Sequence, residues 1–174
     1  MKIYTRLGDH GQTSIYTGAR FKKHSLIINT IGNLDELSSY IGLCRAHLKK
    51  EKKIYKILYD VQKDLYKVTS NLAGAEVDFS EKKVKEIEKY IDKYEKELNP
   101  IKKFILPSGH KKAMHLHVAR TICRRAERKI SEINENEGLY SIELMYINRV
   151  SDLLFVLARY TNKKNKVKEE IVDL

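Results

Sequence analysis

The chain has 174 residues, with 34 lysines and arginines against 23 aspartates and glutamates, for a formal net charge of +11. This length is typical of a single domain with its own core, so we expect one domain over residues 1–174. No apolar run approaches the roughly 18 residues of a membrane-spanning helix, and the first residues lack the apolar stretch of a secretory signal. Two widely separated cysteines argue against a disulfide scaffold. We therefore expect a soluble protein of the cytoplasm.

The excess positive charge is concentrated in two short segments. Residues 1–24 hold five basic residues against one acid, and residues 110–130 hold seven against one. Elsewhere lysine and glutamate alternate, as in 81–97, which is typical of a solvated helix surface. Charge confined in this way favours a compact polyanion, such as a nucleoside triphosphate, over a long nucleic acid duplex, although basic charge alone also fits a plain solvated surface.

The first 24 residues predict a structured loop with the ingredients of a phosphate cradle. The stretch Thr5-Arg6-Leu7-Gly8-Asp9-His10-Gly11-Gln12-Thr13-Ser14 combines glycines, hydroxyl side chains and a base, and Lys22 and Lys23 follow. Backbone amides freed by tight turns bind anions. The stretch lacks the GK[ST] of a Walker A motif, and a sequence of this kind is often just a loop.

Five helical segments follow, at about 25–48, 52–75, 80–98, 110–134 and 141–161, each with apolar residues at helical spacing. Ser80 is expected to cap the third, and Asn99-Pro100 ends it. The fifth is apolar on nearly all sides and should be the most buried. Because no stretch has a strand pattern, we predict an all-α, five-helix up-and-down bundle over 25–161, with a charged tail at 162–174 that frays.

Polar residues within the helical stripes are the candidates for a binding site. One face of the fourth helix carries a charged cluster: Arg120, Arg124, Glu127 and Arg128. Like charges at this spacing repel by a few tenths of a kcal/mol unless an anion lies between them. Glu127 can hold one arginine in a bidentate pair and leave the others for phosphate oxygens. Asn148 and Asp152, one turn apart in the fifth helix, fit either a site or a polar core network.

The sequence contains no evident protein nucleophile or metal site. The six histidines are scattered, and a helix turns His115 and His117 to different faces. Neither cysteine lies in a nucleophile motif. Asp35 can pair with the arginines or a metal, and we assign no role to Glu36. An enzyme with this sequence would have to position a reactive partner that comes from elsewhere.

Five motifs, which span nearly the whole chain, closely resemble those of the PduO-type ATP:cob(I)alamin adenosyltransferases. They are the Thr5–Thr13 loop, Asn33-Leu34-Asp35-Glu36-Leu37, Phe104-Ile105-Leu106-Pro107, Arg124-Arg125-Ala126-Glu127-Arg128 and Tyr146-Ile147-Asn148-Arg149. The resemblance implies a homotrimer of five-helix bundles with sites at subunit interfaces. It implies transfer of the 5′-deoxyadenosyl group of ATP to the cobalt of cob(I)alamin, with release of triphosphate.

The resemblance also implies residue roles. One subunit would bind ATP through its first loop, at Thr5, Arg6, Gly8, Asp9, Gly11, Thr13, Ser14 and Lys23. The neighbouring subunit would contribute Arg124, Arg125, Glu127, Arg128 and Asn148. For catalysis it implies Arg124, an Asp35–Arg120 pair across the interface, and Phe104 against the lower face of the corrin, where it excludes the axial ligand. Mg²⁺ would sit on the triphosphate, with a reductase and a cobalamin-dependent acceptor enzyme as possible partners.

One departure and two alternatives accompany this interpretation. Pro107-Ser108-Gly109 stands where the family usually has Pro-Gly-Gly. A bundle that binds ATP or a corrinoid without catalysis would use the same motifs. A helical RNA-binding protein is disfavoured, because the tyrosines and phenylalanines mostly fall on helical stripes instead of interleaving with the arginines of 120–128.

Overall fold

The computed structural model describes residues 3–4 and 6–172, so Thr5 lies outside the described residues. A hairpin of β1 (Gln12–Ser14) and β2 (Arg20–Lys22) precedes the helices α1 (Leu26–His47), α2 (Lys52–Leu72), α3 (Glu81–Glu95), α4 (Lys111–Glu137) and α5 (Ser141–Lys164). The predicted five-helix bundle is confirmed. No helix in the described part of the chain combines the length and the apolarity that a membrane crossing requires.

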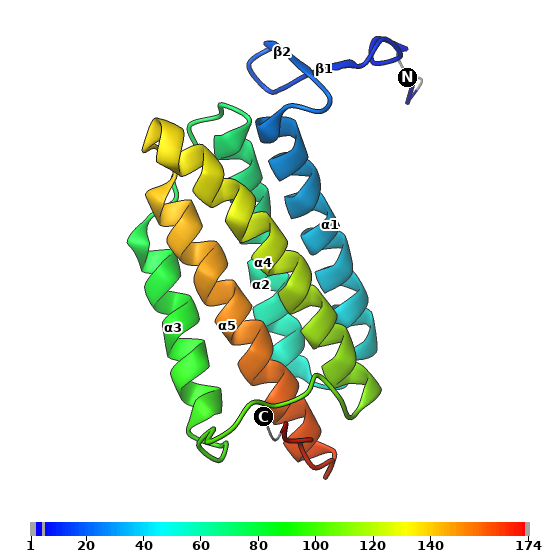
Figure 1. Cartoon of the computed structure of the whole chain (residues 1–174), viewed down its shortest axis with the longest axis vertical. Helices are drawn as coiled ribbons and strands as arrows, with labels where there is room; N and C mark the ends of the chain where they lie inside the picture. The colour runs from blue at the N-terminus through cyan, green and yellow to red at the C-terminus, as the bar shows by residue number, and fades with distance from the viewer. Residues whose placement is uncertain (1–2, 5, 173–174) are drawn as a thin grey trace.

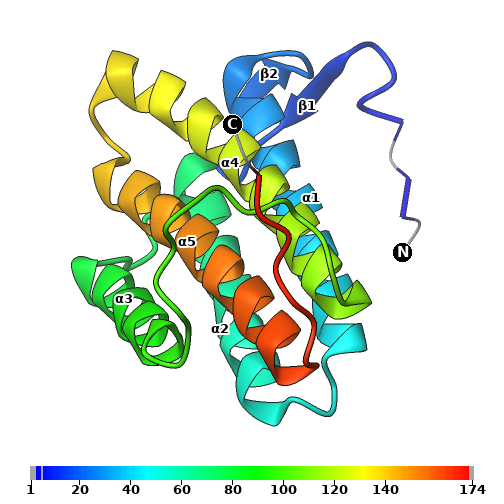
Figure 2. The same cartoon turned by 60° about the horizontal axis from the view of Figure 1, so that its bottom comes forward.

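Successive helices run in opposite directions along the long axis of the molecule (Figure 1). α4 packs against both α1 and α5, α3 packs mainly against α5, and α1 packs against α2. Because α5 lies between α3 and α4, the chain that joins them, residues 96–110, crosses the end of the bundle (Figure 1, Figure 2).

The core is centred on α5, in agreement with the prediction that this helix is the most buried. Tyr146, Ile147 and Leu154 of α5 are 0% exposed, and buried residues occur around nearly its whole circumference. Leu34 of α1 and Leu116 of α4 are equally buried. Burial of each such side chain contributes about 1.5–3 kcal/mol, so this core holds the helix surfaces of the site in fixed positions.

Helix ends follow the predicted signals with small differences. Ser80 occupies the N-cap position of α3 with an extended backbone, although its side chain makes no capping hydrogen bond. α4 continues past its predicted end at 134 to Glu137, where Gly138 adopts a left-handed φ of 68° and donates its N–H to the Asn134 carbonyl at 2.8 Å. A glycine tolerates this conformation because it has no Cβ.

The expectation that no segment forms a strand is wrong for residues 12–22. β1 and β2 pair antiparallel, with Thr13 opposite Phe21. Strands of 3 residues are too short to show the alternating hydrophobic pattern that marks a strand in a sequence. The hairpin gives the glycine-bearing N-terminal segment a defined fold.

The expectation that the charged tail frays is also wrong for its described part. α5 extends to Lys164, and the chain then returns along the 104–106 segment (Figure 2). The Leu106 N–H donates to Glu170 O, and the Val172 N–H donates to Phe104 O, each at 2.9 Å. These hydrogen bonds between two connecting segments cannot be anticipated from the composition of the tail.

Candidate functional site

Residues 6–24, here called the basic loop, fold back on themselves around Gly8. The hairpin returns Lys23 to this glycine, so that a Cβ added to Gly8 would lie 3.2 Å from the Lys23 Nζ. The Lys23 N–H donates to Gly11 O at 2.9 Å. Three of the predicted ATP ligands are therefore brought together by the local fold.

The basic loop exposes its polar groups to solvent. Arg6 and Gly11 both have positive φ, at 61° and 76°. For a residue other than glycine this conformation costs about 1–2 kcal/mol, and left-handed residues next to ordinary ones turn successive N–H groups into anion-binding concavities. Asp9 and Ser14 are exposed and Thr13 is half-buried, whereas the predicted ligand Thr5 lies outside the described residues. The arrangement suits phosphate binding.

Arg120, Arg124 and Arg128 form a second cationic feature on α4, here called the arginine row. Arg124 Nη1 lies 4.0 Å from Glu127 Oε2. Asn148 of α5 donates from Nδ2 to Glu127 Oε1 at 2.7 Å. The predicted pairing of Glu127 with one arginine is confirmed, but as a single long contact instead of a bidentate one. Arg124 remains half-exposed, with guanidinium N–H groups to offer to an anion.

The structure does not bring every predicted residue to this row. Arg125 forms an ion pair with Glu36 of α1, because consecutive residues on a helix point about 100° apart. Glu36, to which the sequence assigned no role, thus joins α1 to α4. Asp35 is exposed, and within the described chain no ion pair joins it to Arg120.

Phe104 and Arg120 line one cavity of about 750 Å³, here called the Phe104 pocket. Phe104 is 73% exposed, and its carbonyl is fixed by the hydrogen bond from Val172. Phe155 of α5 forms another wall, with the Arg120 guanidinium carbon 5.9 Å from its ring centre. Two of the predicted catalytic residues are thus brought together from distant parts of the chain, in a pocket with aromatic walls and one guanidinium.

Among the described residues, no ion pair with a carboxylate is found for Arg120. Burial and the charge of Arg124 lower the pKa of Arg120, and its Nε has no hydrogen-bond partner in the described structure. His117, one turn away, is 4% exposed, and burial and the Arg120 charge lower its pKa to about 4. His117 is therefore neutral near pH 7 and adds no second positive charge beside Arg120.

Asn162 at the end of α5 holds the segment that precedes α4. Its Oδ1 accepts from the His110 N–H at 2.9 Å, and its Nδ2 donates to Ser108 O at 3.0 Å. Gly109 has a φ of 107°, and a Cβ there would lie 2.5 Å from Asn162 Oδ1. Glycine is thus required at 109, whereas Ser108 is accommodated, so the departure from Pro-Gly-Gly leaves this turn intact.

The basic loop and the Phe104 pocket lie at opposite ends of the bundle. The loop leads into the first turn of α1, whereas the pocket lies where residues 96–110 cross the other end (Figure 1). The arginine row lies on α4, which runs from one end to the other. The described chain therefore does not by itself close the two cationic features around one ligand.

Comparison with known proteins identifies the family. The family model for cobalamin adenosyltransferase matches residues 3–161. The chain belongs to the cobalamin adenosyltransferase family. It is 38% identical over 174 residues to a corrinoid adenosyltransferase of Bacillus subtilis, covering 96% of this chain and 90% of the relative. It is also 38% identical over 181 residues to the corrinoid adenosyltransferase MMAB of Homo sapiens, covering 98% of this chain and 72% of that one.

Solved structures of this cobalamin adenosyltransferase family agree with the fold. A phenylalanine-to-histidine variant of the PduO-type ATP:corrinoid adenosyltransferase from Lactobacillus reuteri, complexed with cobalamin and ATP, matches with a TM-score of 0.92 at 34% identity, covering 98% of this chain and 96% of that chain. An arginine-to-lysine variant from the same organism, complexed with ATP, has a TM-score of 0.91 at 34% identity, covering 98% and 100%. The family inferred from the sequence motifs is confirmed.

In this family member, sequence reasoning missed three residues that build the site: His117, Phe155 and Asn162. His117 and Phe155 lie among apolar helix positions, so their spacing is that of ordinary core residues. Asn162 is nearly buried at the end of a helix otherwise rich in apolar side chains, and that mismatch was a usable signal.

Proposed function

We propose that this chain transfers the 5′-deoxyadenosyl group of ATP to the cobalt of a reduced corrinoid, using the Phe104 pocket and the arginine row. The observation that carries the proposal is the joint lining of one cavity by Phe104 and Arg120, with Arg124 on the next turn of α4. An aromatic wall suits an apolar macrocycle, and adjacent guanidiniums suit phosphate oxygens. Membership of the cobalamin adenosyltransferase family supports both assignments.

The proposed chemistry needs no nucleophile from the protein. Cobalt(I) supplies the electron pair that forms a bond to C5′ of ATP, the C5′–O5′ bond breaks, and its electrons leave with the triphosphate. The absence of a protein nucleophile from this mechanism agrees with the state of the two cysteines. Both are buried, and burial raises the pKa of the Cys44 thiol to about 12, which disfavours the reactive thiolate. The chain's residues then act by orienting the two reactants and by neutralising the leaving group.

The arginine row is assigned to the triphosphate. Arg124 and Arg128 are both exposed on α4 and offer N–H donors to phosphate oxygens. Glu127, held by Asn148, restrains Arg124 from one side and leaves most of its donors available. Charge that develops on the leaving oxygen would meet groups already in position, which is the most effective form of electrostatic stabilisation.

A second subunit completes the proposed site. Because the basic loop lies at the far end of its own bundle, a neighbouring copy is proposed to bring its loop, with Arg6, Gly8 and Lys23, to the arginine row. The exposed Asp35 of that copy would pair with Arg120, for which the described part of one chain shows no ion pair. We propose a homotrimer, as the family resemblance implies.

Magnesium is proposed to arrive with the nucleotide. Among the described residues, no group of three or more histidine, cysteine or acidic side chains can hold a metal ion. Mg²⁺ commonly keeps its waters and binds substrate phosphates instead of a protein cage. The chain's residues therefore fit MgATP as a substrate and do not fit a resident magnesium site.

Phe104 is assigned to the lower face of the corrin. It is exposed, and its segment is fixed to the tail by two backbone hydrogen bonds, from Val172 N–H to Phe104 O and from Leu106 N–H to Glu170 O. A ring held there would keep a lower axial ligand off cobalt and so make cobalt(II) easier to reduce. The cytoplasmic location, a reductase that supplies cobalt(I) and an acceptor enzyme that takes the product belong to the same proposal.

The test is incubation of the protein with ATP, Mg²⁺ and chemically reduced cobalamin. We expect adenosylcobalamin to form, detected by its absorption spectrum and by the loss of that spectrum in light, together with one triphosphate per product. Binding of both substrates without product would show a non-catalytic binding bundle. Failure to bind either would overturn the proposal.

A further inference from the structure

The segment that crosses the end of the bundle, residues 96–110, is held by different partners near its ends and in its middle. Near the ends, Asn99 O and Ser108 O accept hydrogen bonds from side chains of α5 at 2.9 Å and 3.0 Å. Between these points, the Phe104 carbonyl accepts a hydrogen bond at 2.9 Å from residues 165–172, here called the strap. The position of Phe104 therefore depends on where the strap is held.

The backbone of Phe104 is fixed more firmly than its side chain. The side chain is 73% exposed, so packing contributes little to its placement. The strap runs beside the crossing segment (Figure 2), and the two form an antiparallel bridge. Val172 N–H donates to Phe104 O, and Leu106 N–H donates to Glu170 O. Because the Phe104 carbonyl makes one of these bonds itself, a shift of the strap would move Phe104 with it.

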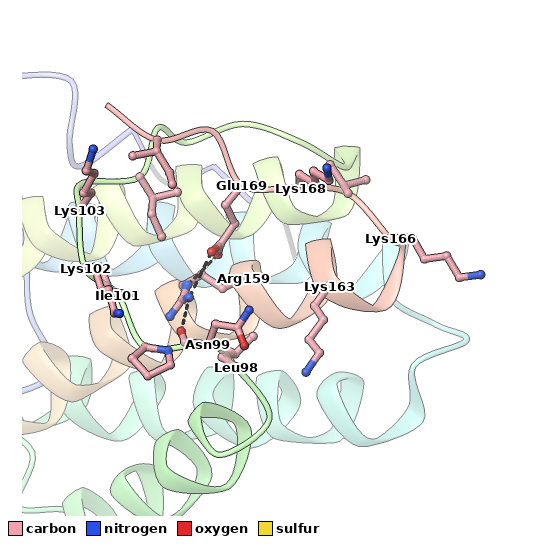
Figure 3. A pocket seen from close by; sticks show the side chains of 14 residues that line it. Leu98, Asn99, Ile101, Lys102, Lys103, Arg159, Lys163, Lys166, Lys168 and Glu169 are labelled. Atoms are coloured by element: carbon pink, nitrogen blue, oxygen red, sulfur yellow. Dashed lines mark hydrogen bonds and ion pairs between the residues drawn. The ribbon is translucent and has the colours of Figure 1, made fainter. Parts of the chain in front are cut away.

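A buried ion pair anchors the strap to α5. Glu169 accepts from Arg159 Nε at 2.7 Å and from Arg159 Nη2 at 3.1 Å, as the dashed lines in Figure 3 show. Arg159 is 4% exposed, and a guanidinium removed from water is stable only where acceptors meet its N–H groups. Glu169 directly precedes Glu170, whose carbonyl is bonded to the crossing segment. The anchor thus acts where the strap meets the segment that carries Phe104.

Arg159 also contacts a wall of the Phe104 pocket. Its guanidinium carbon lies 6.0 Å from the ring centre of Phe155, one turn earlier on α5, and Phe155 lines that pocket. The same guanidinium donates to Asn99 O near the start of the crossing segment (Figure 3). One buried cation therefore joins three parts of the chain that shape the pocket: α5, the crossing segment and the strap.

We propose that Arg159 is a positioning residue for Phe104. Through Glu169 it fixes the strap, and through the strap it fixes the backbone of Phe104 in the lining of the Phe104 pocket. This rests on the proposed function, in which Phe104 keeps a lower axial ligand off cobalt and so eases the reduction of cobalt(II). The ion pair is then needed for the reduction of bound cobalt(II), and it matters little once cobalt(I) is supplied.

Hydrogen exchange of the free protein tests the anchor without reliance on the proposed function. Glu169→Gln is compared with Glu170→Gln, which removes the same charge from the next residue, whose side chain is exposed. We expect the Leu106 and Val172 amides to exchange on the order of tenfold faster in Glu169→Gln, because a lost charge-assisted pair shifts a local opening equilibrium by about that factor. Glu170→Gln should exchange as wild type does. Wild-type protection in both variants would overturn the proposal.

Electron paramagnetic resonance then tests the effect on cobalt. In the ATP-loaded protein with cobalt(II) cobalamin, we expect Glu169→Gln to lower the four-coordinate signal by roughly two- to tenfold, with ATP affinity unchanged. Arg159→Met, which keeps the length of the side chain without its charge, should lower the signal as well. Arg159→Lys should retain more of it, because a lysine can still pair with Glu169. A wild-type signal in Glu169→Gln and Arg159→Met would overturn the positioning role.

Two adenosylation assays separate positioning from a general loss of structure. One starts from cobalt(I) cobalamin that is chemically reduced beforehand. The other starts from cobalt(II) cobalamin with a reductant too weak for the free, five-coordinate form. We expect Glu169→Gln to lose rate mainly in the second assay, and Glu170→Gln to lose it in neither.

The remaining outcomes distinguish the levels of failure. Equal losses in both assays, together with a lower melting temperature, would show that the ion pair is merely structural and would overturn the positioning role. An active wild type with Glu169→Gln unaffected in both assays would overturn that role alone. A wild type that forms adenosylcobalamin in neither assay would overturn the proposed function, and the role of Arg159 in it.

Discussion

Asn148 on α5 donates a 2.7 Å hydrogen bond to one carboxylate oxygen of Glu127 on α4, while Arg124 approaches the other oxygen. The partly buried carboxylate therefore links α4 and α5, the two most closely packed helices of the bundle, to the arginine row. The neighbouring Arg149 donates in turn to Asn148 Oδ1 and to Glu88 of α3. Arg124 is thus positioned by a chain of polar contacts across three helices.

Replacing Asn148 tests whether this chain positions Arg124. In Asn148→Ala the partly buried Glu127 loses a hydrogen bond worth about 1–2 kcal/mol, so we expect a five- to thirtyfold loss in kcat/KM for ATP. Steady-state kinetics at saturating corrinoid measure it. A fall in melting temperature with unchanged kinetics would show a purely structural role, and Asn148→Gln should recover part of the activity.

Arg124→Ala tests the triphosphate assignment itself. Because Arg124 is half-exposed and has one long contact at 4.0 Å, we expect the fold and the helical circular dichroism to persist while kcat falls by roughly a hundredfold or more. Lys129→Ala, which removes an exposed i,i+3 pair with Glu132 on the same helix, is the matched control and should leave turnover near wild type. Unchanged turnover in Arg124→Ala would remove this arginine from the site.

Phe104→Ala tests the role at the lower face of the corrin. The side chain is 73% exposed, so its loss should cost little stability and leave ATP affinity unchanged. We expect the spectral signature of four-coordinate cobalt(II) to be suppressed, because a water or the tail base regains access to the metal. Electron paramagnetic resonance of the ATP-loaded protein with cobalt(II) cobalamin measures it. Persistence of the signature would contradict the assignment, and Leu139→Ala, at another exposed apolar side chain, is the control.

Gly109→Ala and Ser108→Gly test the turn that precedes α4. An alanine at φ 107°, with its Cβ 2.5 Å from Asn162 Oδ1, should lower the free energy of unfolding by about 2–4 kcal/mol. Ser108→Gly restores the usual family sequence and should change it by less than about 1 kcal/mol, since the Ser108 side chain has no hydrogen-bond partner in the described structure. Urea denaturation at one fixed protein concentration compares them. Equal effects would show that the close approach to Asn162 does not constrain this turn.

His117 predicts a loss of stability in mild acid. Its folded pKa of about 4 lies below the ordinary 6.5, so between these values the unfolded chain binds more protons than the folded one. The stabilisation is present above pH 6.5 and is lost as the pH falls toward 4, by roughly 2–3 kcal/mol. In His117→Gln, urea denaturation should show a shallower decline over this range than wild type. The exposed His24→Gln should keep the wild-type slope; if all three slopes agree, His117 is not the group that titrates.

The sequence by itself determined the helices and the identity of most candidate residues. Apolar residues at helical spacing predicted a helix at about 52–75, and α2 spans Lys52–Leu72. The spacing of Arg124 and Arg128 likewise placed them on one face of a helix. These features are local, since a periodic pattern and a cap are read within a few turns of one helix. The family could also be identified from the sequence, because its motifs are short and occur in a fixed order along the chain.

Only the tertiary structure decided which of these residues meet. Arg125 pairs with Glu36 of α1, whereas the adjacent Arg124 approaches Glu127 of its own helix. Phe104 and Arg120 share a cavity, and the tail beyond α5 pairs with the segment that carries Phe104. Such contacts join residues that are far apart in the chain. They depend on the packing of α5 between α3 and α4, and on ion pairs such as the one between the buried Arg159 and Glu169. Which side chains are buried, and which groups form hydrogen bonds and ion pairs, are decided by the packing of the whole bundle. The spacing of residues within one helix therefore does not predict them.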